Sequence, residues 1–303
     1  MRAGPASKAG DSFTTAKTSK KRSARRPVWC AKSVEPPYGS AAFGTPMRRE
    51  APPARTAAGI VNRIGPMLLY GEDDIDGPWM PMISVIVPIK NEGPETVERF
   101  RRFASGPGAE LLIADGGGNE ETTRAFRQIG ARIVPGAGPR GERLGRAAHE
   151  ARGEAFFFIH SDSEPPPDAL AIIARCASNG AVSGAFSLAY RDADLRMRWI
   201  AWWANLRSRR LALPFGDQGI FCSRATYEKA GGIRALPVCD DVDFVRRLKR
   251  VSRLEIRPEK TITSPRRYRE QGALRQVFRN WRVLAGYFLG ASPEKLERWY
   301  YGK

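Results

Sequence analysis

The sequence lacks several features that define large classes of proteins. No apolar run approaches the roughly 20 residues of a membrane-spanning helix, and we expect neither such a helix nor a hydrophobic secretory signal. Histidine is nearly absent, with two in 303 residues, too few for a histidine-based metal site. The cysteines form no C-x-x-C pair, which argues against a zinc ribbon or a disulfide scaffold. We therefore expect a cytoplasmic protein with reduced thiols at Cys30, Cys176, Cys222 and Cys239.

Acidic residues are few relative to basic ones. The chain has 32 Asp+Glu against 50 Lys+Arg, a net charge of +18 and a pI near 10.3. Residues 81–303 alone carry 37 Lys+Arg and 25 Asp+Glu, so the excess is not confined to one end. Such a surface attracts anions, for example phosphates, nucleic acid or acidic lipid headgroups. The charge limits the classes of binding partner but does not define the fold.

Residues 1–80 show no recurrent apolar spacing of a helix or strand. They contain 13 Lys+Arg and 9 Pro, and we predict a disordered basic leader. Translation from an overcalled start, organellar targeting, and a tether to nucleic acid or membrane remain open explanations of this segment. The folded domain is expected at residues 81–303.

From Ile83 onward, short apolar runs alternate with helical patterns, which is typical of an α/β sheet built from βαβ units. Residues 155–159 are apolar throughout, which favours a central strand covered on both faces. Further strands are predicted at residues 83–88, 110–114, 131–134, 181–189 and 219–222. Helices are predicted at residues 94–105, 119–128, 140–152, 166–177, 194–213 and 242–250.

Polar and acidic residues gather where three predicted strands end. In an open α/β sheet, the crevice at the carboxyl ends of the strands binds ligands. Asp162 directly follows the apolar central strand, where a carboxylate is costly unless it meets solvent, a donor or a metal. This position suits Mg²⁺ or Mn²⁺ on a diphosphate, and capping of the next helix is the alternative. Asp115 has its own alternative, as the first residue of a glycine-rich turn.

The ordered motifs resemble the family 2 glycosyltransferases, inverting enzymes of the GT-A fold. The N-terminal motifs are ISVIVPIKNE at 83–92, ADGGGNEET at 114–122 and FIHSDSEPP at 158–166. The downstream motifs are similar to a bacterial subgroup labelled arsenosugar-biosynthesis-type glycosyltransferases: GDQGIF at 216–221, GG at 231–232, CDDVDFVRRLK at 239–249 and SPRRY at 264–268. The resemblance spans about residues 82–301.

The resemblance implies a fold, a reaction and a division of the domain. The fold is an α/β, GT-A αβα sandwich with a mostly parallel central sheet and C-terminal amphipathic helices. The reaction is hexosyltransferase-type, metal-assisted transfer from a nucleotide-diphospho-sugar to a hydroxyl acceptor with inversion. Residues 81–165 would form the nucleotide-binding half, 166–265 the acceptor half and 266–303 the C-terminal helices.

The resemblance also implies roles for the matching residues. Asp241 would be the general base, with Asp240 beside it, and Asp162, the last acid of the D-x-D motif, would hold Mg²⁺ or Mn²⁺. Residues implied on the acceptor side are Asp217, Gln218, Arg266 and Arg267. Residues implied at the donor nucleotide are Pro88, Glu92, Asp115, Arg140, His160 and Asp162.

Inverting sugar transfer requires carboxylates and a divalent cation of this kind. Inversion at an anomeric carbon needs a base for the acceptor proton and neutralisation of the departing nucleoside diphosphate. At the start of a helix, the dipole stabilises Asp240 and Asp241, whereas their mutual repulsion raises a pKa toward that of a useful base. From the residues alone, plain capping of this helix is an equally good interpretation.

Three positions depart from the family pattern. His160 stands where D-x-D has its first Asp, so the ribose contact must differ while metal binding through Asp162 is retained. Asp240 replaces the usual Glu, which keeps the charge and shortens the reach. Arg143 and Gly145 stand in place of two subgroup amides.

Two predicted helices carry aromatic stripes edged by arginine. Trp199, Trp202 and Trp203 fall on one side of the first, and Phe278 and Trp281 on one side of the second. Interfacial membrane helices have this composition, so peripheral contact with an anionic membrane is one expectation. Packing of the stripes on the sheet or on a partner subunit is the other.

Other function classes fit less well. A sugar-phosphate nucleotidylyltransferase needs a glycine-rich basic loop directly after its first strand, where this chain has Pro-Ile-Lys-Asn-Glu. The pI suggests a nucleic-acid-binding protein, but no recognised nucleic-acid module is present. A non-catalytic nucleotide-sugar-binding protein is the third alternative, for which His160 is the one indication.

Overall fold

The computed structural model describes residues 81–104, 106, 108–178 and 183–302. All of them belong to one compact unit of the chain, Tyr70–Lys303. The predicted disordered leader, residues 1–80, and its Cys30 lie outside the described residues, and so does the start of the strand predicted at 181–189.

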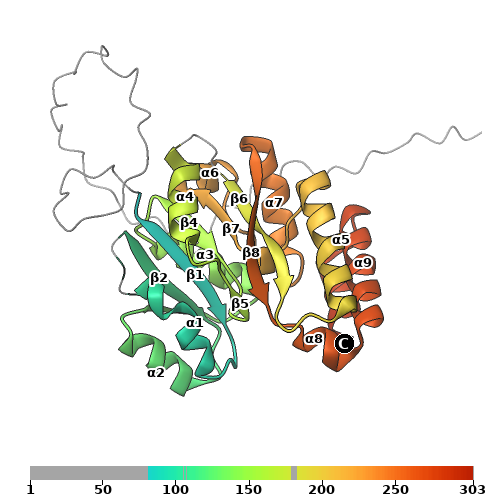
Figure 1. Ribbon diagram of the computed structural model, residues 1–303, viewed down its shortest axis with the longest axis horizontal. Coiled ribbons are helices and arrows are strands. Elements are labelled where there is room, and N and C mark those ends of the chain that lie inside the picture. Colours follow the sequence, from blue (N-terminus) through green and yellow to red (C-terminus); the bar gives the residue numbers. More distant parts are fainter. Residues whose placement is uncertain (1–80, 105, 107, 179–182, 303) are drawn as a thin grey trace, which may run out of the picture. The chain divides into compact units, whose positions relative to one another are not determined.

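A central sheet of eight described strands organises this unit, in the order β3-β2-β1-β4-β7-β6-β8-β5 (Figure 1). The pairs β1–β2, β2–β3, β1–β4 and β6–β8 are parallel, whereas β7 and β5 run against their neighbours. The predicted α/β fold with a mostly parallel sheet is therefore confirmed. The strands are β1 (Ile83–Ile89), β2 (Ala109–Asp115), β3 (Arg132–Pro135), β4 (Ala155–Phe158), β5 (Ser163–Glu164), β6 (Ser183–Tyr190), β7 (Ile220–Ser223) and β8 (Leu254–Thr263).

Helices cover both faces of the sheet, which gives an αβα sandwich. One apolar cluster joins the sheet to α1, α2 and α4, and a second joins it to α3, α7 and α9. The helices are α1 (Glu95–Ala104), α2 (Glu120–Gln128), α3 (Arg140–Glu150), α4 (Ala169–Ser178), α5 (Leu195–Leu211), α6 (Arg224–Lys229), α7 (Asp240–Val251), α8 (Arg266–Gln271), α9 (Ala273–Phe288) and α10 (Pro293–Tyr301). The six helices predicted from the sequence all appear, with ends shifted by up to three residues.

The strands form where β-branched and aromatic residues concentrate. All seven residues of β1 are buried, and alternate side chains enter opposite layers: Val85 and Val87 enter the first cluster and Ile86 the second. All four residues of β4 are buried as well, which confirms the predicted central strand. Because β1 and β4 are parallel neighbours, their carboxyl ends lie side by side.

The sequence reading assigned no strand to residues 254–263, where β8 lies. Pro258 interrupts this stretch, and proline in a run of strand residues argues against a central strand. The register with β6 shifts at this point: Phe186 pairs with Arg257, and the next residue, Ser187, pairs with Lys260. This irregularity leaves Pro258 out of the ladder, as a β-bulge does.

Helices α9 and α10 pack beside the start of α7. Val283 and Leu296 form a cluster with Val238, directly before α7. Gly286 permits the close approach of α10, since a Cβ there would lie 2.5 Å from the Trp299 ring. None of the described helices is long and apolar enough to cross a membrane.

The two aromatic stripes do not pack on the sheet. The face of α5 that packs against β6 carries Met197 and Ala201, whereas Trp199 and Trp202 are each 56% exposed. On α9, Trp281 is 55% exposed. The predicted alternative of packing on the sheet is wrong because smaller side chains occupy the inner faces of both helices.

Candidate active-site cleft

A cleft of about 1080 Å³ opens at the carboxyl ends of β1 and β4. Its lining includes the segment after β1, the segment after β4, and the first residues of α3 and α7. The segment around α8, the inner face of α9 and the end of α10 complete the wall. This is the sheet edge at which the sequence motifs were expected to meet.

Ten of the twelve predicted site residues line this cleft. They are Pro88, Glu92, Arg140, His160, Asp162, Asp217, Asp240, Asp241, Arg266 and Arg267. The other two, Asp115 and Gln218, are not among its lining residues. Motifs that are up to 179 residues apart in the sequence thus share one cavity.

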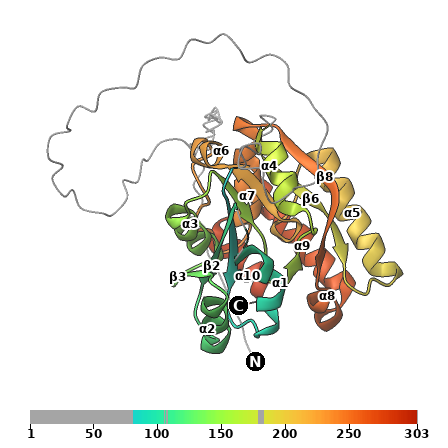
Figure 2. The ribbon, with the colours of Figure 1, turned by 60° about the vertical axis from the view of Figure 1, so that its left-hand side comes forward.

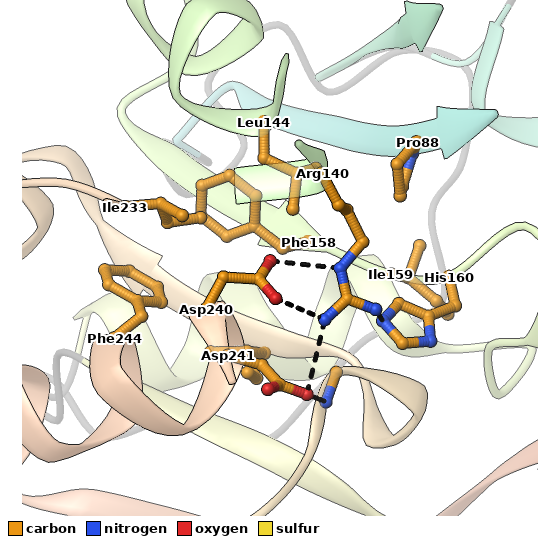
Figure 3. Close-up of a pocket in the computed structure, with 12 residues that line it drawn as sticks. Pro88, Arg140, Leu144, Phe158, Ile159, His160, Ile233, Asp240, Asp241 and Phe244 are labelled. Carbon is orange, nitrogen blue, oxygen red and sulfur yellow. Dashed lines mark hydrogen bonds and ion pairs between the residues drawn. The ribbon is translucent and has the colours of Figure 1, made fainter. Parts of the chain in front are cut away.

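Arg140 is the centre of the polar network in this cleft (Figure 3). Its Nε and Nη2 donate to Asp240 Oδ2 and Oδ1 at 3.0 and 2.6 Å, and Nη2 lies 3.8 Å from Asp241 Oδ2. The Asp240 side chain is 3% exposed, so its charge depends on this bidentate partner. Arg140 therefore neutralises Asp240 and makes only a longer ion pair with Asp241.

His160 is held as a neutral acceptor by the same arginine. Arg140 Nη1 lies 2.8 Å from His160 Nε2, and because a guanidinium can only donate, Nε2 must accept. The ring proton is then on Nδ1. Burial and the Arg140 cation lower the pKa of His160 to about 3, which agrees with a neutral ring. Gly216 allows this arrangement, since a Cβ there would lie 2.4 Å from Nε2.

Asp241 sits in the first turn of α7 with its carboxylate toward the cleft. Its Oδ2 accepts from the Gly216 backbone N–H at 2.9 Å, and its Oδ1 accepts from the Val242 N–H at 2.8 Å. Cys239 precedes the pair in the left-handed region, with a φ of 60°. A non-glycine residue in this conformation stores strain, which is common at functional sites.

Asp217 contributes another carboxylate to the cleft. Its Oδ1 is buried without a hydrogen bond among the described residues. Burial raises the pKa of Asp217 to about 6, and Asp162 and Asp241 add to the rise while Arg207 opposes it. A carboxylate that is kept in an unfavourable place is a candidate functional group.

The residues present fit a divalent metal that is shared with a diphosphate. Asp162 lines the cleft, and the hydrogen bond recorded to its carboxylate is a long one, 3.3 Å from Ser163 Oγ. Hard carboxylate oxygens of this kind suit Mg²⁺ or Mn²⁺. Within residues 81–302, no group of three or more His, Cys, Asp and Glu could hold a metal alone, so phosphate and water would have to complete its shell.

Glu92 braces the two strand ends that carry the motifs. Its Oε1 accepts from Ser161 Oγ at 2.8 Å, and its backbone carbonyl accepts from Thr122 Oγ1 at 2.8 Å. Arg99 of α1 donates to the Ser161 carbonyl from the other side. The loop after β1 is thereby tied to the loop after β4 that presents Asp162.

Asp115 and Gln218 use their side chains within the fold. Asp115 accepts from the Gly117 N–H at 2.8 Å and from Thr123 Oγ1 at 2.9 Å, as expected of a residue that opens a glycine-rich turn. Gln218 is fully buried, donates to the Phe186 carbonyl at 2.9 Å and accepts from Ser208 Oγ at 2.7 Å. Gln218 therefore does not present its side chain to an acceptor in this cleft.

The structure tests the two helix-capping alternatives, for Asp162 and for the pair Asp240 and Asp241. Asp162 is seven residues before α4 and does not cap it, so that alternative is wrong. Cys239 occupies the N-cap of α7, and Asp240 and Asp241 are its first two residues. Asp240 accepts a hydrogen bond from Arg140 of α3, so the pair does more than begin helix α7.

Three residues of the site had no role assigned from the sequence. Buried Arg143 donates to the carbonyls of Ile89 and Ala114 at 2.6 and 3.1 Å and so ties the ends of β1 and β2 together. Tyr190 and Tyr268 also line the cleft, with ring centroids 5.5 Å apart. No spacing in the sequence joins these two tyrosines, because they come together only through the β6–β8 pairing.

The cysteines of the described residues, Cys176, Cys222 and Cys239, form no disulfide with one another. Burial raises the pKa of the Cys222 thiol, and burial with the nearby acids raises that of Cys239 to about 12.

Residues 84–227 match the model of glycosyl transferase family 2. This match covers 144 of the 303 residues, just under half of the chain, and agrees with the family resemblance of the N-terminal motifs. A search of curated proteins finds no match.

Three solved glycosyltransferase structures are similar to this chain. A mannosyltransferase from Pyrobaculum calidifontis, in complex with GDP-Man and Mn²⁺, is 20% identical, with a TM-score of 0.47 over 61% of this chain. The match spans 57% of that mannosyltransferase, less than two thirds of its length. Glucosyl-3-phosphoglycerate synthase from Mycobacterium tuberculosis is 21% identical, with a TM-score of 0.48 over 66% of this chain and 78% of its own. TarS from S. aureus, in complex with UDP-GlcNAc, is 15% identical, with a TM-score of 0.47 over 60% and 58%.

Proposed function

We propose that this chain is a metal-assisted inverting glycosyltransferase that uses a nucleotide-diphospho-sugar donor and a hydroxyl acceptor. The observation that carries the proposal is that Asp162, within the residues that match family 2, and Asp241, beyond them, line one cleft at the carboxyl ends of β1 and β4. The downstream motifs support placing it as a hexosyltransferase in the bacterial arsenosugar-biosynthesis-type subgroup.

In the proposed reaction, Asp241 removes the proton of the acceptor hydroxyl as that oxygen attacks the anomeric carbon. The new oxygen–carbon bond forms as the bond from that carbon to the diphosphate oxygen breaks, and the nucleoside diphosphate leaves with the electron pair. Asp241 is the better placed acid of the pair because Asp240 is committed to Arg140. Attack opposite to the leaving group inverts the configuration.

The donor would lie against the strand ends and the start of α3. Pro88 and Glu92 border this part of the cleft, and Arg140 would face the diphosphate or the base from its fixed position. Asp162 would hold Mg²⁺ or Mn²⁺, which supplies positive charge to the diphosphate as it departs. His160 Nδ1–H is a donor for a ribose or phosphate oxygen, in place of the family's first Asp.

The acceptor would lie on the side of Asp217, Arg266 and Arg267. The free Oδ1 of Asp217 suits a hydroxyl donor from the acceptor. The proposal also includes peripheral contact with an anionic membrane through α5 and α9, because neither helix contains an acidic residue and both expose tryptophan. A nucleotidylyltransferase is disfavoured because β1 leads into Lys90-Asn91-Glu92 rather than a glycine-rich basic loop.

The substitution Asp241→Asn tests the assignment of the base. It keeps the size of the side chain and removes the proton acceptor, so we expect transfer to fall at least about 100-fold while donor binding is retained. Release of nucleoside diphosphate from a panel of nucleotide sugars, with and without Mn²⁺, measures the first, and calorimetric titration of the nucleotide measures the second.

Asp168→Asn is the matched control, because it makes the same chemical change at an exposed aspartate outside the cleft. We expect this variant to behave like the unaltered chain. Equal turnover by Asp241→Asn and the unaltered chain would remove Asp241 as the base.

A further inference from the structure

The outer faces of α5 and α9 each carry exposed apolar side chains, which together we call the aromatic face. On α5 it consists of Leu195, 80% exposed, together with Trp199, Trp202 and Trp203. On α9 it consists of Leu274, Phe278 and Trp281, which are 83%, 71% and 55% exposed. Figures 1 and 2 place α5, α8 and α9 at the same end of the sheet, by β6 and β8. Exposed aromatic groups on this scale mark an interaction surface.

The charge on these helices has one sign. The residues of α5 include five arginines and those of α9 include three, and neither helix contains an acid. Arg196, Arg198 and Arg275 are exposed beside the aromatic side chains. Tryptophan with arginine is the composition of helices that lie in the interface of an anionic membrane.

Charge complementarity selects the occupant of the aromatic face. A second copy docked through the same face would bring equally cationic helices against it, and residues 1–66 carry 13 Lys+Arg against 3 Asp+Glu. Both would meet like-charge repulsion, whereas anionic lipid headgroups would not. A bilayer also accepts the tryptophan rings at headgroup depth.

The α9 helix connects this face to the cleft. Its outer side carries Phe278 and Trp281, and its inner side contributes Asn280, Val283 and Leu284 to the cleft wall. An α-helix is about 10 Å across, so the cleft wall would lie about that far from the membrane surface. The headgroup layer is itself about 5–8 Å thick, which brings a hydroxyl on a headgroup within reach of the acceptor side.

We infer that the aromatic face docks on an anionic membrane and that the acceptor is a hydroxyl on a lipid headgroup, delivered past α9 to the side of Asp217 and Arg267. This inference rests on the proposed function for its second half only. Docking stands on the exposed face and its charge, whether or not the chain transfers sugar.

Sedimentation of the full chain with vesicles tests docking. The probes are phosphatidylcholine vesicles with and without phosphatidylglycerol, at low and high salt. Arg196→Ala, Arg198→Ala and Arg275→Ala together should weaken binding to the anionic vesicles about 100-fold, at roughly one kcal/mol per arginine. Arg124→Ala, Arg127→Ala and Arg152→Ala, three exposed arginines near the other edge of the sheet, are the matched control and should leave binding unchanged.

The acceptor half is tested with alcohols presented in two forms. With the nucleotide sugar that stabilises the chain, transfer to phosphatidylglycerol or phosphatidylinositol in vesicles is compared with transfer to free glycerol or inositol. We expect faster transfer to the lipid-borne form, lost in the Arg196, Arg198 and Arg275 variant and in Trp199→Ser with Trp281→Ser.

Each alternative result would overturn a specific part of the inference. No binding to anionic vesicles, or equal binding by the two arginine variants, would overturn docking, as would a dimer in light scattering that Trp281→Ser converts to a monomer. Transfer to neither form, or as fast to the free alcohol, would overturn the lipid acceptor. Absence of stabilisation by any nucleotide would instead overturn the proposed glycosyltransferase activity and leave the docking result unaffected.

Discussion

Asp217→Asn should make the protein more stable at neutral pH while it impairs the site. Asp217 has a carboxylate oxygen that is buried without a hydrogen bond, and burial raises its pKa to about 6 from an ordinary value of 3.8. Asp162 and Asp241 raise it further, whereas Arg207 and Arg140 oppose the rise. The amide keeps the shape and cannot ionise, so the substitution removes the cost of burying the charge.

The magnitude follows from the linkage between protonation and folding. Because the pKa of Asp217 is higher in the folded than in the unfolded chain, the folded state favours the protonated acid. Stability is therefore retained at low pH and lost as the pH rises from 3.8 through about 6. At 1.36 kcal/mol per pH unit, the loss is at most about 3 kcal/mol, and solvent in the open cleft reduces it to roughly 1–3 kcal/mol.

Thermal unfolding of the two chains at pH 4.5, 6 and 8, in the presence of a chelator, measures this effect. At pH 8 we expect the Asp217→Asn variant to melt about 3–10 °C higher, with the gap shrinking toward pH 4.5. Transfer activity should fall in the same variant. A variant no more stable than the unaltered chain at pH 8, or a gap independent of pH, would refute the reasoning.

Two further substitutions test whether Gln218 supports the fold and whether Gly216 supports donor binding. Gln218→Ala removes the buried hydrogen bonds of the amide with the Phe186 carbonyl and Ser208 Oγ, so we expect about 2–4 kcal/mol less stability in urea unfolding and unchanged nucleotide affinity. A large loss of affinity with normal stability would contradict this. Gly216→Ala places a Cβ 2.4 Å from His160 Nε2, so the ring must move and break its contact with Arg140. We expect roughly 10-fold weaker nucleotide binding by calorimetry, from a steric cost of about 1–3 kcal/mol, and unchanged affinity would show that His160 does not contact the donor.

The sheet was predictable wherever strands are apolar and bounded by turns. Residues 83–88 and 155–159 read as strands because buried parallel strands are apolar without alternation, and the structure has β1 and β4 there. Strand β8 was not predictable in the same way. Pro258 falls within it, and only the shifted register with β6 removes the proline from the ladder.

The candidate site was predictable at its motifs and not in its connections. Asp162 was identified because an acid that follows a buried strand is conspicuous in a sequence, and Asp241 was identified through the family resemblance of its motif. The pairing of Arg140 with Asp240 joins residues 100 positions apart, and no local pattern indicates it. Gln218 is a case in which the motif was misleading. It is a polar residue of a family motif, but its side chain makes its hydrogen bonds within the core.

Thermal stabilisation by nucleotides is the most direct test of the donor site. The full chain would be melted with a panel of nucleoside diphosphates and nucleotide sugars, with and without Mn²⁺, beside Asp162→Ala. Saturating ligand at about 100 times its Kd should stabilise the chain by about 2.7 kcal/mol, or roughly 5–10 °C. We predict such a shift for one base, dependent on Mn²⁺ and lost in Asp162→Ala; no shift with any nucleotide, or one that persists in the variant, would contradict the account.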